Sequence, residues 1–237
     1  MTGRIDVDPL QGHWLTVVRH SPLALLLDLD GTLIPLSRTP DEAEVDPELR
    51  AILQRCCALQ HVVVAVISGR PQSWMGARFD DLPALWVAAE HGAWRRGAGA
   101  WEHSVDMDPS PLDELVAELE AIVARYPGAV IERKTWSLAI HSRAVRSAGR
   151  VAFVVEARAA VMSFLGRAAR FERVDGSDII EVRALGMRKS SIVPWVREHA
   201  GEDTRIVNAA SAGRASVRLR AAGAYPVRAL DGPRIGR

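Results

Sequence analysis

The segment LLLDLDGTL, residues 25–33, places two aspartates at the end of an apolar run that begins at Leu23. A short continuous apolar run of this kind suits a strand that is covered on both faces. Gly31 then supplies a turn, because glycine adopts turn conformations at no steric cost. Asp28 and Asp30 therefore follow a buried strand, and the sequence predicts a functional site at its tip.

Further buried strands and helices follow in alternation. A helix is expected from Pro47, with Asp46 as its N-cap, and a second strand is expected over Val62 to Ile67. A third strand is expected near Leu85. This alternation predicts a doubly wound parallel sheet with helices on both faces, in which ligands bind beyond the carboxyl ends of the strands. The side chains at those ends are Asp28, Asp30, Ser68, Arg70, Glu90 and His91.

The middle of the chain has a different order of elements. A helix is expected from Pro111, with Ser110 as its N-cap, followed by two strand-like runs over 129–134 and 135–143. A long amphipathic helix and two more strand-like runs, RFERV and DIIEVRA, come next. We therefore expect an α+β unit over 108–184, inserted into a core made of 1–107 and 185–237.

Composition restricts the class of partner and the compartment. The formal net charge of the chain is +1, which argues against a general nucleic-acid or membrane surface. The two cysteines, Cys56 and Cys57, are adjacent and lie within an apolar helical pattern, which favours buried thiols in a reducing environment. The first residues hold no apolar leader segment, and the expectation is a cytoplasmic protein without a membrane span.

Paired carboxylates at a strand tip suit phosphoryl transfer. One carboxylate can attack phosphorus and carry the phosphoryl group, and a second, when protonated, can give its proton to the leaving oxygen. Like charges about 4 Å apart repel by roughly 4 kcal/mol at an effective dielectric near 20, so an anionic phosphate beside them calls for a cation. Mg²⁺ is the usual cation at such sites.

The string DLDGTL resembles the first motif of the haloacid dehalogenase superfamily of phosphatases. The resemblance implies that Asp28 is the nucleophile and Asp30 the general acid and base, and that Mg²⁺ is bound by Asp28 and by the backbone carbonyl of Asp30. Ser68 matches the second motif, whose hydroxyl donates to a phosphoryl oxygen. The structural alternative for Ser68 is a helix N-cap, and the two roles are compatible.

Five segments in order resemble the trehalose-6-phosphate phosphatases: DLDGTLIPL, ISGR, AAEHGAW, ERKTWSLAIHSR and EVRALGMRK. The similarity runs from about residue 24 to 195. It implies a haloacid dehalogenase-like core with an inserted α+β cap, and Mg²⁺-dependent hydrolysis of trehalose 6-phosphate. Lys189 matches the third-motif lysine, which neutralises the nucleophile and the phosphoryl group. The chain has only one other lysine, Lys134.

The same resemblance implies which residues contact the sugar. The cap candidates are Glu132, Lys134, Ser137, His141 and Arg143, and the core candidates are Glu90 and His91. For His141 and Ser137, a role in sheet packing or in a bond to the backbone is as good an explanation as contact with the sugar. Arg70 either pairs with an acid in the core or contacts the substrate.

One family motif is missing. The fourth motif is an acidic cluster that follows a strand and completes the Mg²⁺ site, but here the strand TRIVN is followed by AASAGRAS, with no carboxylate between Thr204 and Leu230. This predicts an impaired metal site. Three explanations of the Arg-rich tail stay open: a shift of the reading frame, a decayed gene copy and real divergence. Two other functions stay open: a non-catalytic sugar-phosphate-binding or regulatory relative, and a phosphatase of another sugar phosphate.

Overall fold

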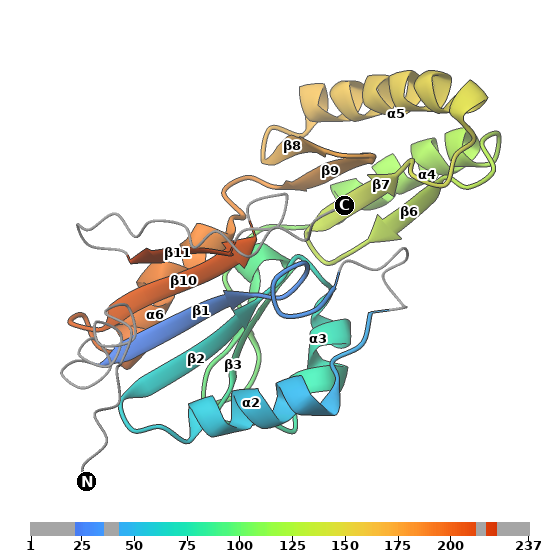
Figure 1. Ribbon diagram of the computed structural model, residues 1–237. Coiled ribbons are helices and arrows are strands. Elements are labelled where there is room, and N and C mark those ends of the chain that lie inside the picture. The colour runs from blue at the N-terminus through green and yellow to red at the C-terminus, as the bar shows by residue number, and fades with distance from the viewer. Residues whose placement is uncertain (1–21, 36–42, 212–216, 222–237) are drawn as a thin grey trace, which may run out of the picture.

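A computed structural model describes residues 22–35, 43–211 and 217–221. These residues form two β-sheets, one of seven strands and one of four. The larger sheet and its helices form the core, and the smaller sheet lies over one end of the core with two helices on its outer face (Figure 1). The expected α/β core with an inserted α+β cap is confirmed.

Strand β1 lies inside the core sheet, where it pairs in parallel with β2 and β10. The order of the strands is β11-β10-β1-β2-β3-β4-β5, with β4, β5 and β11 antiparallel at the two edges. Their bounds are β1 Leu23–Asp28, β2 Val62–Ile67, β3 Trp86–Ala89, β4 Trp94–Arg96, β5 Glu102–His103, β10 Arg205–Ser211 and β11 Val217–Ala221. The apolar runs predicted β1, β2 and β3, whereas the short strands β4 and β5 were not predicted.

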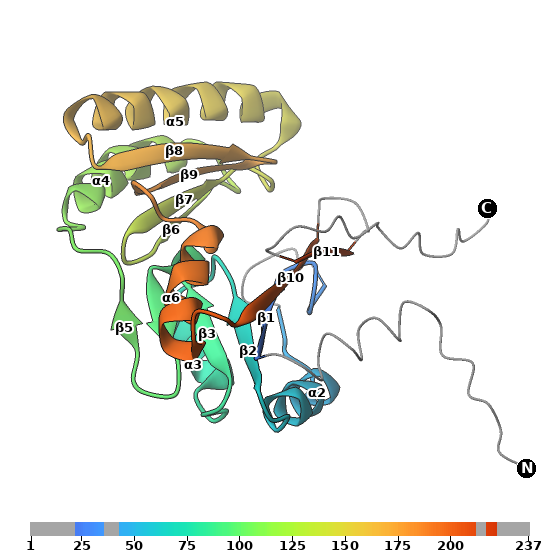
Figure 2. The ribbon, with the colours of Figure 1, turned by 90° about the vertical axis from the view of Figure 1, so that its left-hand side faces the viewer.

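Helices cover both faces of the core sheet, as Figures 1 and 2 show from two sides. Val64 and Val66 of β2 pack in a cluster with residues of helices α2 (Pro47–Cys57) and α3 (Gln72–Phe79). The alternate residues Ala65 and Ile67 pack in a second cluster with α6 (Ile192–Ala200). A strand whose two faces are both buried reads as a continuous apolar run, which explains the sequence of β2.

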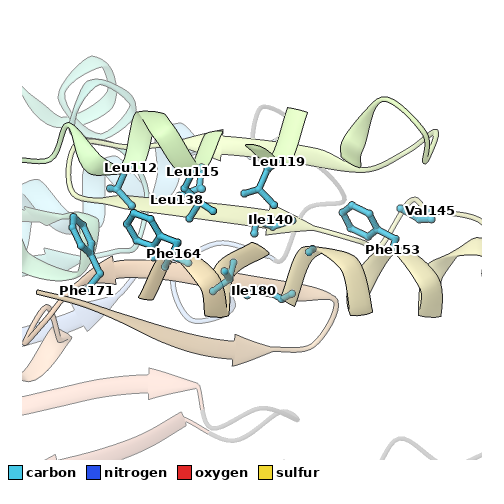
Figure 3. Packing of buried hydrophobic residues seen from close by; sticks show 13 residues of the cluster. Leu112, Leu115, Leu119, Leu138, Ile140, Val145, Phe153, Phe164, Phe171 and Ile180 are labelled. Carbon is cyan, nitrogen blue, oxygen red and sulfur yellow. The ribbon is translucent and has the colours of Figure 1, made fainter. Parts of the chain in front are cut away.

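The cap has its own hydrophobic core. Its strands are β6 Val130–Arg133, β7 Ser137–His141, β8 Phe171–Gly176 and β9 Ile179–Ala184, paired antiparallel in the order β6-β7-β9-β8. Helices α4 (Pro111–Val123) and α5 (Ser147–Arg167) cover one face of this sheet. Figure 3 shows Leu115 and Leu119 of α4 and Phe164 of α5 packed against Leu138 and Ile180.

The two predicted helix caps have different outcomes. The prediction for Asp46 is confirmed, because its carboxylate accepts a bond from the backbone N–H of Leu49 at 2.7 Å. Ser110 stands at the N-cap position of α4, but its hydroxyl makes no capping bond. It donates instead to Asp108 at 2.6 Å, so Ser110 is the N-cap residue as predicted but does not cap the helix through its side chain.

Two linkers join the cap to the core, one between β5 and α4 and the other after β9. We propose 108 and 184 as the bounds of the cap, since both positions lie where the chain passes between the two sheets. Within the described ranges, no helix is long and apolar enough to cross a membrane. Most of the Arg-rich tail, residues 212–216 and 222–237, lies outside the described residues.

Candidate active site

The expected site lies at one edge of the core sheet. Asp28 is the last residue of β1 and pairs in register with Ile67, the last residue of β2. Gly31 turns the chain with φ of +75°, a value that glycine adopts without strain. Parallel strands end at the same edge, so Asp28, Asp30 and Ser68 are neighbours in space.

Lys189 reaches this edge from a distant part of the sequence. It begins a short 3₁₀ helix, η3 (Lys189–Ser191), and its Nζ donates to Oδ1 of Asp28 at 2.5 Å. The Asp28 side chain is 12% exposed and that of Lys189 is 41% exposed. The ammonium group thus neutralises a largely buried carboxylate, which leaves a nearly neutral place for an anionic group.

Asp30 is held by the segment that follows β2. Arg70 donates to Oδ1 of Asp30 from Nε at 3.0 Å and from Nη2 at 2.7 Å. The hydroxyl of Ser68 donates to Oδ2 at 2.9 Å and accepts from the N–H of Arg70. Helix α3 has Pro71 at its N-cap, so Ser68 is not a helix cap. Arg70 was expected either to pair with an acid in the core or to contact the substrate, and its geometry supports the pair with Asp30.

A left-handed turn, η2 (Glu90–Gly92), follows β3 and packs on this segment. Glu90 and His91 have φ of +48° and +58°, values that residues other than glycine rarely adopt. Two backbone bonds hold the turn in place: the N–H of Glu90 donates to Arg70 O and that of His91 donates to Ser68 O, both at 2.9 Å. The turn therefore shares its support with the groups that hold Asp30.

The inner face of the cap sheet, which we call the polar face, points toward this edge of the core. Its polar members share one side of the four strands by register: Glu132, Ser137, His141, Glu172, Glu181 and Arg183. Two contacts join it to the core. His91 Nε2 lies 3.0 Å from Glu181 Oε1, and Lys134, which follows β6, donates to the carbonyl of Gly69 at 3.0 Å.

Two carboxylates of the polar face have lowered pKa values. Burial acts to raise the pKa of Glu181, but the hydrogen bond with His91 and the charges of His91 and Lys134 outweigh it. Burial likewise opposes ionisation of Glu132, whose pKa is lowered by the hydrogen bond with His141 and by the Lys134 charge. Both groups are therefore anionic acceptors at neutral pH.

The expected sugar-contact residues are only partly gathered. Glu132 lies 3.2 Å from His141 and 3.7 Å from Lys134, so these three form one cluster. Ser137 is fully buried, and within the described residues its hydroxyl has no hydrogen-bond partner. Arg143 lies elsewhere: it follows β7, is 61% exposed, and its Nε is 4.0 Å from Asp178.

Three residues at the site were not predicted. Glu181 is a polar position between the apolar residues Ile180 and Val182, and this alternation was a usable signal. Gly69 carries the carbonyl that Lys134 reaches, and Thr135 contacts Glu90. No pattern of local sequence marks the last two, because their contacts join the cap to the core.

The register of β10 shows which residues lie level with Asp28, where the acids of the missing fourth motif would be expected. Ala209 pairs with Leu27, so the backbone of the next residue, Ala210, lies level with Asp28. Glu202 and Asp203 precede β10 and lie at the opposite end of the strand, where Arg205 pairs with Leu23. No cluster of three or more His, Cys, Asp or Glu that could hold a metal occurs within 22–35, 43–211 and 217–221.

The donors that remain still fit Mg²⁺. This cation is commonly held by one or two carboxylates together with a substrate phosphate and water. The Asp28 carboxylate and the Asp30 backbone carbonyl are hard oxygen donors of this kind, at the edge where a phosphate would bind. The set is small, which is consistent with weak binding.

Comparison with known proteins gives a consistent result. The sequence model of the trehalose-phosphatase family matches residues 26–214. A bifunctional trehalose-6-phosphate synthase/phosphatase of Thermoproteus tenax is 28% identical over 200 residues, which are 84% of this chain and 27% of that protein. A trehalose-phosphatase of Saccharomyces cerevisiae is 34% identical over 176 residues, 71% of this chain and 19% of that protein. The chain thus spans less than a third of either relative.

The fold has solved counterparts. The C-terminal domain of the C. albicans trehalose-6-phosphate phosphatase matches with a TM-score of 0.69 at 23% sequence identity. The match covers 82% of this chain and 72% of that domain. At this identity the likeness shows a shared fold.

The contact between Gly69 and His91 gives the first prediction. A Cβ at position 69 would lie 2.6 Å from Cε1 and 2.7 Å from Nε2 of His91, so Gly69→Ala must displace the imidazole from Glu181. We expect the melting temperature to fall by about 3 to 8 °C, measured by circular dichroism. Gly99→Ala is the matched control, since among the described residues, its own chain neighbours aside, no atom lies within 4 Å of its added Cβ. Equal melting of the two variants would contradict the prediction.

Proposed function

Because the chain belongs to the trehalose-phosphatase family, we propose that it hydrolyses trehalose 6-phosphate to trehalose and phosphate, as a step of trehalose biosynthesis. The observation that carries the proposal is the arrangement at the edge of the core sheet. Lys189 pairs with Asp28, Arg70 and Ser68 hold Asp30, and the polar face of the cap lies opposite.

The first half of the proposed reaction uses Asp28 as the nucleophile. Its carboxylate attacks phosphorus, the bond from phosphorus to the sugar oxygen breaks, and an aspartyl phosphate forms. The Lys189 ammonium, 2.5 Å from Asp28, offsets the charge that the incoming phosphate adds. The Ser68 hydroxyl donates to a phosphoryl oxygen.

Asp30 is the proposed general acid and base. In its protonated form it gives a proton to the departing sugar oxygen, and as the carboxylate it takes one from the water that cleaves the aspartyl phosphate. Arg70 holds Oδ1 of Asp30 through both steps, whereas the Ser68 hydroxyl, which donates to Oδ2 in the structure, turns to the phosphoryl oxygen when substrate binds and leaves Oδ2 to carry the proton. Arg70 is thus proposed as a positioning residue.

Mg²⁺ is the proposed cofactor. Asp28 and the Asp30 backbone carbonyl would hold it, and when bound it would neutralise charge on the phosphate. The absence of carboxylates from Thr204 to Leu230 leaves this ligand set smaller than the family pattern, so we propose that the cation is held weakly.

Recognition of the sugar is assigned to the polar face and to Lys134 beside it. Sugar hydroxyls need hydrogen-bond partners, and a site built from buried polar groups rejects ligands that cannot pair with them. Glu132, Lys134 and Glu181 are the proposed sugar-binding residues, since they are charged, largely buried and close to the core edge. A small-molecule sugar phosphate is therefore the proposed ligand. The cytoplasm is the proposed compartment, consistent with the free thiols of Cys56 and Cys57.

One observation favours a second candidate function. The missing acidic motif is what a non-catalytic sugar-phosphate-binding or regulatory relative would show, because binding tolerates a weak metal site better than catalysis does. A phosphatase of another sugar phosphate would keep the catalytic groups and differ at the polar face. The experiments below separate the three.

The nucleophile is tested by Asp28→Asn. We expect the purified protein with Mg²⁺ to release phosphate from trehalose 6-phosphate, and the variant to lose at least about 1,000-fold in rate, because an amide is a poor nucleophile. Phosphate release measured colorimetrically checks this. A parent protein no faster than Asp28→Asn would favour the non-catalytic candidate.

The polar face is tested by comparing two substrates. Glu132→Ala should lower kcat/KM for trehalose 6-phosphate by about 10- to 100-fold, which is the effect of losing a hydrogen bond to a charged group. The kcat/KM for a small aryl phosphate should change much less. The reason is that, of the two parts of the substrate, Glu132 is proposed to meet the sugar and not the phosphate. Equal losses on both substrates would assign Glu132 to the fold.

The metal site is tested by restoring acids beside Asp28. Successive residues of any strand point to opposite faces, so the combination of Ala210→Asp and Ser211→Asp offers one carboxylate to each face. We expect the Mg²⁺ concentration for half-maximal rate to fall at least about tenfold, or about 1.4 kcal/mol. The same change in the Asp28→Asn background should restore no turnover. Unchanged Mg²⁺ binding by a folded variant would refute the weak-site proposal.

A further inference from the structure

Glu90 is a buried carboxylate of the core whose hydrogen bonds go to the cap. It is 1% exposed. Its Oε1 accepts from the hydroxyl of Thr135 at 3.0 Å, and its Oε2 accepts from the N–H of Trp136 at 3.3 Å. Both partners lie at the tip of the β6–β7 hairpin, residues 134–136. A buried carboxylate without partners is strongly unfavourable, so Glu90 favours the arrangement in which the cap meets the core.

The hairpin tip is itself bound from several sides. Trp94 of the core donates from Nε1 to the Thr135 hydroxyl at 3.0 Å, so this hydroxyl links two core residues. Arg133 donates from Nη1 to the carbonyl of Thr135 at 2.9 Å, which fixes the turn from within the cap. Contacts within the cap and contacts with the core therefore both hold residues 134–136 in place beside Glu90.

Glu90, which accepts the bonds from the hairpin tip, lies on a strained turn of the core. Glu90 and His91 both have left-handed backbone conformations, which persist only where the surroundings impose them. Their N–H groups are bound to Arg70 O and Ser68 O, and the side chains of Arg70 and Ser68 hold Asp30. A continuous set of hydrogen bonds thus runs from the hairpin tip through Glu90 to Asp30.

We propose that Glu90 is the closing contact of the cap, which binds the hairpin tip at Thr135 and Trp136 and holds the polar face of the cap where it meets the sugar of the substrate. Glu90 is then a positioning residue and not a sugar ligand. The proposal rests on the proposed function for the reaction that it serves, while the contact itself is testable without activity.

Thr135 offers a conservative variant. Thr135→Val removes the hydroxyl and keeps the shape, and Thr135→Ser keeps the hydroxyl. For Thr135→Val we expect kcat/KM for trehalose 6-phosphate to fall about 10- to 100-fold, with the rate on a small aryl phosphate within about twofold of the parent. Thr135→Ser should stay near the parent on both substrates.

Hydrogen exchange of the Trp136 amide, followed by NMR on the full chain without substrate, reports the contact directly. We expect faster exchange in Glu90→Gln and in Thr135→Val, and no further increase in the double variant, because both remove one shared contact. Faster exchange with no phosphate release from either substrate would uphold the contact and refute the proposed function. Unchanged exchange in Glu90→Gln, with a raised KM for trehalose 6-phosphate, would make Glu90 a sugar ligand and overturn the proposal.

Discussion

The parallel pairing of β1 with β2 and β10 is the constraint on which the rest of the molecule depends. Leu27 lies opposite Val66 on one side and Ala209 on the other, so three strands end together at one edge. A slip of one residue would turn every side chain of a strand to the other face. The register therefore fixes where Asp28 meets Lys189 and where Ser68 meets Asp30.

Much of the core fold could be predicted because a strand that is buried on both faces has a continuous apolar sequence, as in Val62 to Ile67. The elements that escaped prediction have physical reasons. Strands β4 and β5 have three and two residues, too few for a period to show. Ser110 has the sequence of a helix cap, but the nearby Asp108 competes for its hydroxyl.

The candidate catalytic groups could be predicted because each sits next to a local signal: Asp28 after an apolar run, Ser68 after another. Contacts between cap and core carry no such signal. Glu90 was expected to contact the sugar, yet in the structure its carboxylate faces Thr135, 45 residues away along the chain. Only the folded arrangement brings a strained turn of the core to a hairpin of the cap.

The joint between cap and core has a mechanical consequence. The two linkers line one cavity of about 370 Å³, so they lie side by side, and Trp136 at the hairpin tip donates to Met107 in one of them. The tip thus lies beside the joint, whereas His141 is five residues beyond Trp136, about 17 Å away along the strand. A rotation of the cap about this joint would therefore move His141 farther from the core than it would move Trp136.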